Sequence, residues 1–187
     1  MNEKEKMLSG ELYNPLLDGL LEERENAKKI CYAYNKLNPE EVQKKLILIK
    51  QLFGKTGSSF TIEPSFQCDY GYNIEIGENF YSNHNLVILD PAKVTFGDNV
   101  FIGPNCGFYT PEHPLDAKTR NTGLELAKPI AVGNNVWIGG GVNVLGGVSI
   151  GDNVVIGAGS VVTKDIPANT VAVGNPCRVI KDLTATI

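Results

Sequence analysis

The sequence lacks the residue patterns that build disulfide frameworks and the common metal sites. Its four cysteines are scattered and include no C-x-x-C pair, so their spacing indicates neither a disulfide scaffold nor a thiolate metal site. Histidine is scarcer still, with only His84 and His113 in the chain. Two imidazoles are too few for a zinc centre with three histidine ligands, and we expect an activity that requires no metal.

A large excess of positive charge and long apolar runs are also absent. Among 187 residues there are 17 Lys and Arg and 21 Asp and Glu, which gives a formal net charge of −4. Residues 1–55 are nearly balanced in charge and the rest of the chain is acidic, so nucleic acid is not an expected partner. No apolar run approaches the roughly 18 residues that span a bilayer, and the charged start leads into no signal-peptide core. We therefore expect a cytoplasmic protein with no membrane partner.

Residues 1–57 carry a helical pattern. Between Leu17 and Leu37, apolar residues recur every three or four positions with charged residues between them. A second helix is predicted to open at Asn38, a favoured N-cap, with Pro39 in the first helical position. We expect this segment to cap the structure that follows. A second possibility is that it also forms a wall of a substrate pocket.

A strict six-residue repeat occupies the second half of the chain. The repeated apolar positions are Val132, Ile138, Val144, Ile150, Ile156 and Val162, and a second series follows four positions after each. Because residues two apart share one face of a strand, pairs such as Val136 and Ile138 are predicted to point inward together. Corners rich in Gly and Asn recur 18 residues apart. Three short strands and three corners per coil predict a parallel β-helix over residues 58–187.

The repeat has one long interruption, and a shorter polar one at Tyr81–Asn85. Gly77 and Gly97 mark two earlier corners 20 residues apart, and the next such corner is at Gly133, 36 residues after Gly97. Residues from about 109 to 128 abandon the pattern, with two prolines and many polar side chains. An irregular segment of this length in a compact domain is usually functional or disordered, and we interpret it as an extruded loop.

The polar interruptions contain candidate catalytic residues. His113 lies between two prolines in the extruded loop, and histidine is the side chain best suited to proton transfer near neutral pH. A solvated surface histidine is the alternative interpretation. Asn83 is a candidate donor to an oxyanion, or an ordinary corner residue like Asn85. His84 has no motif around it and is expected to be a surface or packing residue.

Small and cationic residues gather near the C-terminal end of the repeat. The segment Gly157–Ser160 would allow a ligand to approach the coil surface closely. Lys164, Arg178 and Lys181 would be suited to binding phosphate groups. A solvated surface is the alternative interpretation for these cations.

Taken together, the segments resemble the maltose and galactoside O-acetyltransferases of the hexapeptide-repeat superfamily over nearly the whole chain. The matching segments are Ser9–Tyr13, Cys68–Ile74, Asn79–Asn83, the His113 loop, Lys128–Ile130, Asn135–Gly139 and Gly174–Arg178. The fit is closer to the maltose type, because Cys68–Tyr72 and His113–Asp116 both match it. The resemblance implies a left-handed β-helix, acetyl-CoA as the co-substrate, and a homotrimer with each active site between two subunits.

The resemblance also implies roles for individual residues. His113 falls on the catalytic histidine, a general base, and Asn83 on an asparagine of the acetyl-transfer site. Acceptor-binding positions are Asp69, Asp90 and Tyr81. The positions that hold acetyl-CoA are Trp137, Gly140, Ala158, Thr163, Lys164, Arg178 and Lys181. Pro15, flanked by Asn14 and Asp18, stands where the galactoside type has an acidic acceptor-binding residue.

We therefore expect direct acetyl transfer from acetyl-CoA to a hydroxyl of a sugar such as maltose, glucose or a galactoside. Glu112, Asp116 and Glu125 are three candidates for orienting the imidazole, and the sequence does not choose among them. One alternative is an antibiotic O-acetyltransferase, whose relatives generally lack the N-terminal helical segment. The other is a non-catalytic scaffold that uses the flat faces of the β-helix for assembly.

Overall fold

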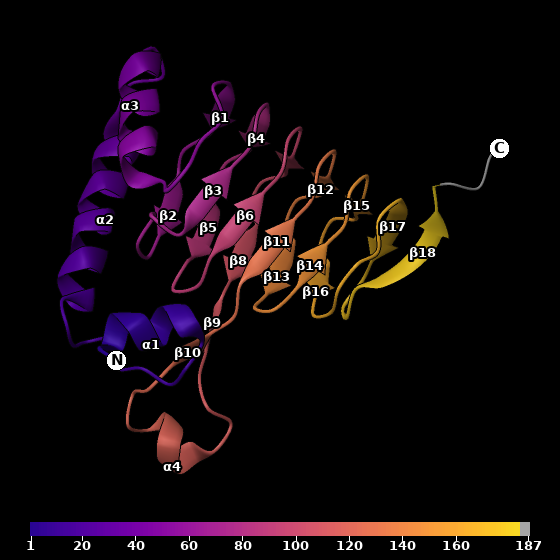
Figure 1. Ribbon diagram of the computed structural model, residues 1–187. Coiled ribbons are helices and arrows are strands. Elements are labelled where there is room, and N and C mark those ends of the chain that lie inside the picture. Colours follow the sequence, from indigo (N-terminus) through magenta and orange to yellow (C-terminus); the bar gives the residue numbers. More distant parts are fainter. Residues whose placement is uncertain (184–187) are drawn as a thin grey trace.

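The computed structural model describes residues 1–183 and shows helices covering one end of a long stack of coils (Figure 1). Three helices precede the coils: α1 (Glu3–Ser9), α2 (Leu20–Lys36) and α3 (Val42–Leu52). In Figure 1, α2 and α3 run side by side across the first coils, and α1 lies near β10. No helix among residues 1–183 is long and apolar enough to cross a membrane.

Both predicted helices exist, but each begins later than the sequence indicates. Asp18 and Gly19 have left-handed backbone conformations, with φ of 53° and 82°, so α2 begins at Leu20. The prediction that α3 opens at Asn38 is wrong, because α3 begins at Val42. The reason is a turn closed by Glu41, whose N–H donates to the Asn38 carbonyl and whose carboxylate accepts the Asn38 N–H at 2.9 Å.

The coils build three parallel sheets, which we call the first, second and third faces in the order in which the chain visits them. The first face contains β1 (Phe60–Ile62), β4 (Phe80–Ser82), β7 (Phe101–Ile102), β12 (Trp137–Ile138), β15 (Val155–Ile156) and β17 (Thr170–Val173), with β18 (Arg178–Asp182) antiparallel at its edge. The second face contains β2 (Phe66–Cys68), β5 (Leu86–Leu89), β8 (Gly107–Tyr109), β13 (Asn143–Leu145) and β16 (Val161–Val162). The third contains β3 (Ile74–Ile76), β6 (Val94–Phe96), β11 (Ile130–Val132) and β14 (Ser149–Ile150).

The apolar residues of the repeat fill the inside of the stack. Val136, Ile138, Val142 and Val144 are each 0% exposed, so the predicted inward pairing of Val136 and Ile138 is confirmed. Strands of successive coils pair in register, with Ile138 opposite Ile102 on one side and Ile156 on the other. Each coil therefore buries its apolar residues against the coils above and below it.

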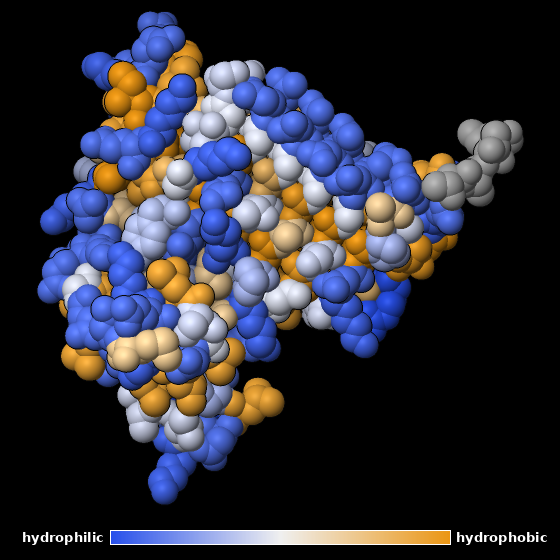
Figure 2. Space-filling view, viewed as in Figure 1, coloured by the Kyte–Doolittle hydropathy of each residue, from blue (hydrophilic) through white to orange (hydrophobic). Residues whose placement is uncertain are grey.

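The turn from the third face to the first is an asparagine corner. Five residues there have φ between 54° and 60°: Asn79, Asn99, Asn135, Asn153 and Asn169. Their amides form a ladder, in which Asn79 donates to Asn99 at 3.0 Å and Asn99 donates to Asn135 at 3.2 Å. Figure 2 shows this edge, beside β12 and β15, as a hydrophilic ridge.

The extruded loop leaves the stack after β8 and returns at β11. It is more ordered than the sequence indicates, with β9 (Pro111–Glu112), α4 (Ala117–Arg120) and β10 (Leu126–Ala127). β9 and β10 pair antiparallel, with Glu112 opposite Leu126, and α4 projects away from the coils (Figure 1). The paired strands form a stem, so the loop presents His113 from a fixed base.

Two clusters of buried side chains join the helices to the coils. In the larger one, Ala27, Cys31 and Tyr34 of α2 pack with Ile49 of α3 against the interior of the first coils. The smaller one contains Met7, Tyr13, Leu20 and Tyr70. The second cluster lies beside the extruded loop and fixes the N-terminal segment there.

Candidate functional site

A cavity of about 690 Å³ lies where the N-terminal segment, α2 and the extruded loop meet. Its lining residues are Asn14, Pro15, Leu16, Arg24, Lys28, Asp69, Leu89, Pro111, His113, Thr122, Gly123 and Glu125. Two predicted site residues, His113 and Asp69, are thus brought together from positions 44 apart in the sequence. A smaller groove of about 280 Å³ between α2, α3 and β1 contains none of the predicted residues.

The imidazole of His113 has its two nitrogens in different surroundings. Nδ1 lies 3.3 Å from the carbonyl oxygen of Leu124, which only accepts hydrogen bonds, so Nδ1 carries the proton. Nε2 lies 3.9 Å from Oε1 of Glu125, and the side chain is 55% exposed. The neutral imidazole therefore presents the unprotonated Nε2 as an acceptor, which is the form a general base requires.

The three carboxylates near His113 have distinct partners. Glu112 forms an ion pair with Lys128 at 2.9 Å. Asp116 caps α4 through the backbone N–H and the hydroxyl of Thr119, both at 2.8 Å, and these bonds hold the pKa of Asp116 below its usual value. Only Glu125 faces the imidazole, so the structure distinguishes among candidates that the sequence leaves equal.

Asp69 lies in a turn at the cavity, and Asp90 is buried beneath that turn. Asp69 lines the cavity, and burial raises its pKa. Asp90 is 0% exposed, and its carboxylate accepts the backbone N–H groups of Asp69, Tyr70 and Gly71 at 3.0, 2.9 and 2.8 Å. Burial raises the pKa of Asp90 to about 6 against the opposing effect of these hydrogen bonds. Asp90 thus holds the turn that presents Asp69.

A second set of predicted residues follows the corner between the first and second faces, which we call the glycine corner. Asn83, Gly140 and Ala158 follow β4, β12 and β15 there, and the Gly103 coil lies between the coil of Asn83 and that of Gly140. A Cβ on Gly103 would lie 2.5 Å from the backbone nitrogen of Gly140, and one on Gly139 would lie 2.6 Å from that of Ala158. Only glycine fits at these two positions, so the backbones of adjacent coils approach each other closely there.

Aromatic side chains flank the glycine corner on the first face. Tyr81, Phe101 and Trp137 are neighbours in register on β4, β7 and β12. Phe101 is 49% exposed and Trp137 is 59% exposed. An exposed aromatic row beside a glycine-lined corner is suited to binding an elongated ligand with apolar and polar parts.

The remaining predicted residues are exposed and lie elsewhere on the coils. Thr163 and Lys164 follow β16, at the corner between the second and third faces. Arg178 and Lys181 lie on β18, at the edge of the first face. The His113 loop also leaves the stack between the second and third faces, whereas Asn83 lies at the glycine corner. Within one chain, His113 and Asn83 therefore lie on different edges of the three-sided β-helix.

Several lining residues of the cavity were not predicted as site residues. Arg24 and Lys28 are four residues apart on α2, a spacing that places both on one helix face and that could have revealed them. Asn14 and Pro15 do line the cavity, whereas Asp18 accepts the backbone N–H of Glu3 at 2.7 Å. Nothing in the sequence pattern indicates that Leu89 belongs to the site.

Comparison with known proteins places the chain in a class and then in a family. Residues 6–57 match the maltose acetyltransferase hexapeptide capping motif, and residues 129–164 match the bacterial transferase hexapeptide. A maltose O-acetyltransferase from Clostridium difficile 630 is 54% identical, with a TM-score of 0.97 and 98% of each chain covered. The galactoside O-acetyltransferase of Escherichia coli is 48% identical over 96% of this chain and 88% of that protein.

Two related structures hold coenzymes. A galactoside acetyltransferase in complex with coenzyme A has a TM-score of 0.95 and 47% identity, covering 98% of this chain and 92% of that one. A hexapeptide-repeat acetyltransferase from Vibrio cholerae, complexed with acetyl coenzyme A, has a TM-score of 0.91 and 37% identity, covering 98% and 99%.

The fold and the site thus define a hexapeptide-repeat acetyltransferase built on a left-handed parallel β-helix; the repeat predicts the β-helix, and the family resemblance implies its hand. Within that class, the chain belongs to the maltose and galactoside O-acetyltransferase family.

Proposed function

We propose that this acetyltransferase moves the acetyl group of acetyl-CoA to a hydroxyl of a sugar such as maltose, glucose or a galactoside, with His113 as the general base. The observation that carries the proposal is the imidazole itself. Its Nδ1 donates to the Leu124 carbonyl, and its Nε2 is left to accept a proton at a cavity that also contains Asp69.

The proposed reaction is a direct transfer within a ternary complex. Nε2 of His113 accepts the proton of the acceptor hydroxyl as its oxygen attacks the thioester carbonyl. The side-chain amide of Asn83 or a backbone N–H donates to the tetrahedral oxyanion. The C–S bond then breaks, and the CoA thiolate takes the proton from His113. The imidazole returns to its neutral form, and none of these steps uses a metal.

The cavity is suited to a polyhydroxylated acceptor. Asp69 and Glu125 can accept hydrogen bonds from hydroxyl groups, and Arg24 and Lys28 of α2 can donate to sugar oxygens. Asp90 acts on the acceptor indirectly, by holding the Asp69 turn. Relatives named for maltose and for galactosides support a sugar, and the lining residues alone do not rank the two.

A complete site requires a second copy of the chain, and we infer a homotrimer. His113 and Asn83 lie on different edges of one chain, so packing of neighbouring prisms around a threefold axis would bring them together. Acetyl-CoA would then lie along the glycine corner beside Trp137, Gly140 and Ala158. The residues proposed for its nucleotide end are Thr163, Lys164, Arg178 and Lys181. Residues 1–57, the loop at about 109–128 and the Asp69 turn would supply the acceptor side, and the coils between residues 58 and 183 the CoA side.

The role of His113 is tested with His113→Ala, assayed by thiol release from acetyl-CoA across a panel of sugars. Turnover should fall by about 10²–10⁴-fold while the melting temperature stays nearly unchanged, because the side chain is exposed. His84→Ala is the matched control, since His84 is exposed and its ring contacts the Pro64 carbonyl instead. Full activity of His113→Ala, or equal losses in both variants, would contradict the proposal.

The shared site is tested by combining His113→Ala with Asn83→Ala, each of which should be inactive when the Asn83 amide is the oxyanion donor. If one site takes His113 from one copy and Asn83 from the next, mixed trimers contain intact sites. Co-expression at equal levels should restore about a quarter of wild-type activity, whereas each variant alone stays inactive. Absence of restoration in confirmed mixed trimers would show that each chain uses its own two residues.

A further inference from the structure

Two cysteines that are far apart in the sequence meet between α2 and β2. Sγ of Cys31 and Sγ of Cys68 lie 3.7 Å apart, although the residues are separated by 37 positions in the chain. Cys31 is 0% exposed and Cys68 is 4% exposed. The scattered cysteines thus include a close pair of thiols, which the proposed acetyl transfer does not use.

The pair is one step in a regular seam between the helix and the strand. The side-chain amide of Asn35 donates to the carbonyl of Phe66 at 2.8 Å and accepts the N–H of Phe66 at 2.9 Å. Cys31 lies four residues before Asn35 on α2, a rise of about 6 Å, and Cys68 lies two residues after Phe66 on β2, a rise of about 7 Å. Because the two steps are nearly equal and α2 lies beside β2 (Figure 1), the backbone places the two thiols opposite each other.

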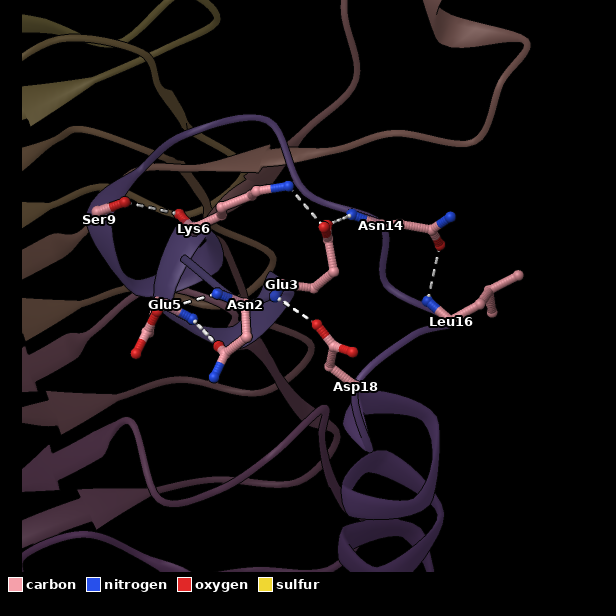
Figure 3. Close-up of polar contacts among 8 residues, drawn as sticks. All are labelled: Asn2, Glu3, Glu5, Lys6, Ser9, Asn14, Leu16 and Asp18. Carbon is pink, nitrogen blue, oxygen red and sulfur yellow. Dashed lines mark hydrogen bonds and ion pairs between the residues drawn. The ribbon is translucent and has the colours of Figure 1, made fainter.

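The other end of α2 is held by the segment that leads into it. Figure 3 shows the Glu3 carboxylate between the Lys6 ammonium group, at 2.6 Å, and the backbone N–H of Asn14. Asp18, two residues before α2, accepts the backbone N–H of Glu3 at 2.7 Å. The helix is thus fixed at both ends, so the two thiols keep their relative position.

The distance between the two sulfurs suits a reduced dithiol that can close to a disulfide. A disulfide bond is about 2.05 Å long, so each sulfur has to move by less than about 1 Å. The hydrogen bond between the two thiols lowers the pKa of Cys31 and, together with burial, raises the pKa of Cys68. Cys31 is therefore the thiol that ionises first and acts as the nucleophile.

The thiol pair lies directly behind the wall of the acceptor cavity. Lys28, three residues before Cys31 on α2, and Asp69, the residue after Cys68, both line that cavity. Local opening of this wall gives a small oxidant access to the thiols from the cavity. A covalent bond between the thiols would in turn draw α2 toward the turn that carries Asp69.

We propose that Cys31 and Cys68 form a peroxide-reactive dithiol, whose disulfide joins α2 to β2 and displaces the Asp69 side of the acceptor cavity. The Cys31 thiolate attacks hydrogen peroxide, the O–O bond breaks, and the leaving oxygen takes up the proton that Cys31 lost, which gives water and a Cys31 sulfenic acid. The Cys68 sulfur then attacks the Cys31 sulfur. The S–S bond forms as the S–O bond breaks, and a second water leaves with the Cys68 proton. Two electrons pass from the two thiols to one peroxide.

The dithiol is tested by treating the folded wild-type enzyme with hydrogen peroxide. The intact mass should fall by about 2 Da as two hydrogens are lost, and peptide mapping should link Cys31 to Cys68. The melting temperature should rise by about 5–10 °C, because the disulfide restricts the unfolded chain, and dithiothreitol should reverse both changes. Absence of the disulfide, or its formation only after unfolding in urea, would overturn the proposal, since the thiols would then be ordinary core residues.

Cys31→Ala and Cys106→Ala are a matched pair of variants for the same treatment. Cys106 is also buried, at 2% exposure, but its thiol donates to the Gly139 carbonyl at 3.2 Å. Peroxide should still raise the melting temperature of Cys106→Ala and should not raise that of Cys31→Ala. Equal rises in both variants would overturn the assignment to Cys31 and Cys68. The peptide map of the wild-type enzyme identifies the pair even when Cys31→Ala does not fold.

The effect on the acceptor cavity is a separate readout, and this part of the inference rests on the proposed function. The disulfide form should have an acceptor kcat/KM about tenfold lower, since a misplacement of about 1 Å can cost as much as about 10²-fold. The KM for acetyl-CoA should not change. An unchanged acceptor kcat/KM would overturn the displacement of the cavity. Failure of the proposed function is distinguishable, because His113→Ala is assayed in the reduced enzyme and the mass and melting measurements need no acceptor.

Discussion

The regular coils and the extruded loop differ in burial and in the contacts that stabilise them. In the coils, Val144 and Ile156 are fully buried, and each strand pairs in register with its neighbours. In the loop, Leu115 is 96% exposed and the side chain of His113 is 55% exposed. The coils obtain their stability from many equivalent contacts, whereas the loop depends on a few specific ones.

Those few contacts explain how an exposed loop can present a catalytic group. Lys128 pairs with Glu112 at the stem, the Leu124 carbonyl accepts from His113, and Tyr13 holds Glu125. Each contact fixes the position of one group of the site and contributes little to the stability of the core. We therefore expect substitutions in the coils to change stability, and substitutions in the loop to change rate.

Ile138→Ala should produce the largest effect on stability. Ile138 is 0% exposed between Ile102 and Ile156, so its truncation should lower the free energy of unfolding by about 2–5 kcal/mol. Urea unfolding measures this, and kcat of the folded fraction should be retained. His113→Ala should instead lower kcat and leave the free energy of unfolding nearly unchanged.

Leu115→Ala is the control for that comparison. It also truncates an aliphatic side chain, but one that is 96% exposed, so the free energy of unfolding should change by no more than about 0.5 kcal/mol. Similar destabilisation by Ile138→Ala and Leu115→Ala would remove the distinction between the two regions.

Asp90→Asn should give an intermediate effect at the boundary between the two regions. An amide in place of the carboxylate turns an NH₂ group toward a backbone N–H that Asp90 now accepts, and a buried donor left unsatisfied costs about 1–3 kcal/mol. The displaced turn should also raise the acceptor KM through Asp69. Thermal unfolding and steady-state kinetics measure the two effects, and a raised KM for acetyl-CoA instead would contradict the assignment of Asp69 to the acceptor.

The pH dependence of the same variant supplies a further check. The pKa of Asp90 is raised from 3.8 to about 6 in the folded chain, so the folded state binds more protons between these values. Stability contributed by this group is therefore lost as the pH rises from about 4 to about 6. The asparagine variant cannot titrate there and should lack that decrease relative to the wild type.

The sequence predicts the coils well because their six-residue periodicity can be recognised from neighbouring residues alone. A side chain at every sixth position must face inward, so Val132 to Val162 can be placed without knowing their neighbours. Asn at corners such as Asn135 is likewise recognisable, since few residues tolerate a left-handed backbone. The segments that resemble the family then identify His113 and Asp69 as site residues, and the structure brings both to one cavity.

The rest of the site depends on contacts that no periodicity encodes. Tyr13 and Glu125 are 112 positions apart, and nothing in either segment indicates the other. Asp90 resembles a pocket residue in sequence, yet it is buried beneath the turn that carries Asp69. The helix start at Asn38 was wrong for a related reason, because the Glu41 side chain closes a competing turn.

Apart from the Leu115→Ala control, the smallest effect we predict concerns the asparagine corner, where backbone conformation can be separated from the amide ladder. Asn99 has φ of 56° and bonds to Asn79 and Asn135. Asn99→Gly loses the ladder bonds but tolerates the left-handed backbone, whereas Asn99→Ala loses both and should be less stable by about 1 kcal/mol. Asn143, within β13, is the matched control, and there the order should reverse because glycine weakens a strand. The same order at both positions, measured by urea unfolding, would show that backbone conformation does not select asparagine at the corners.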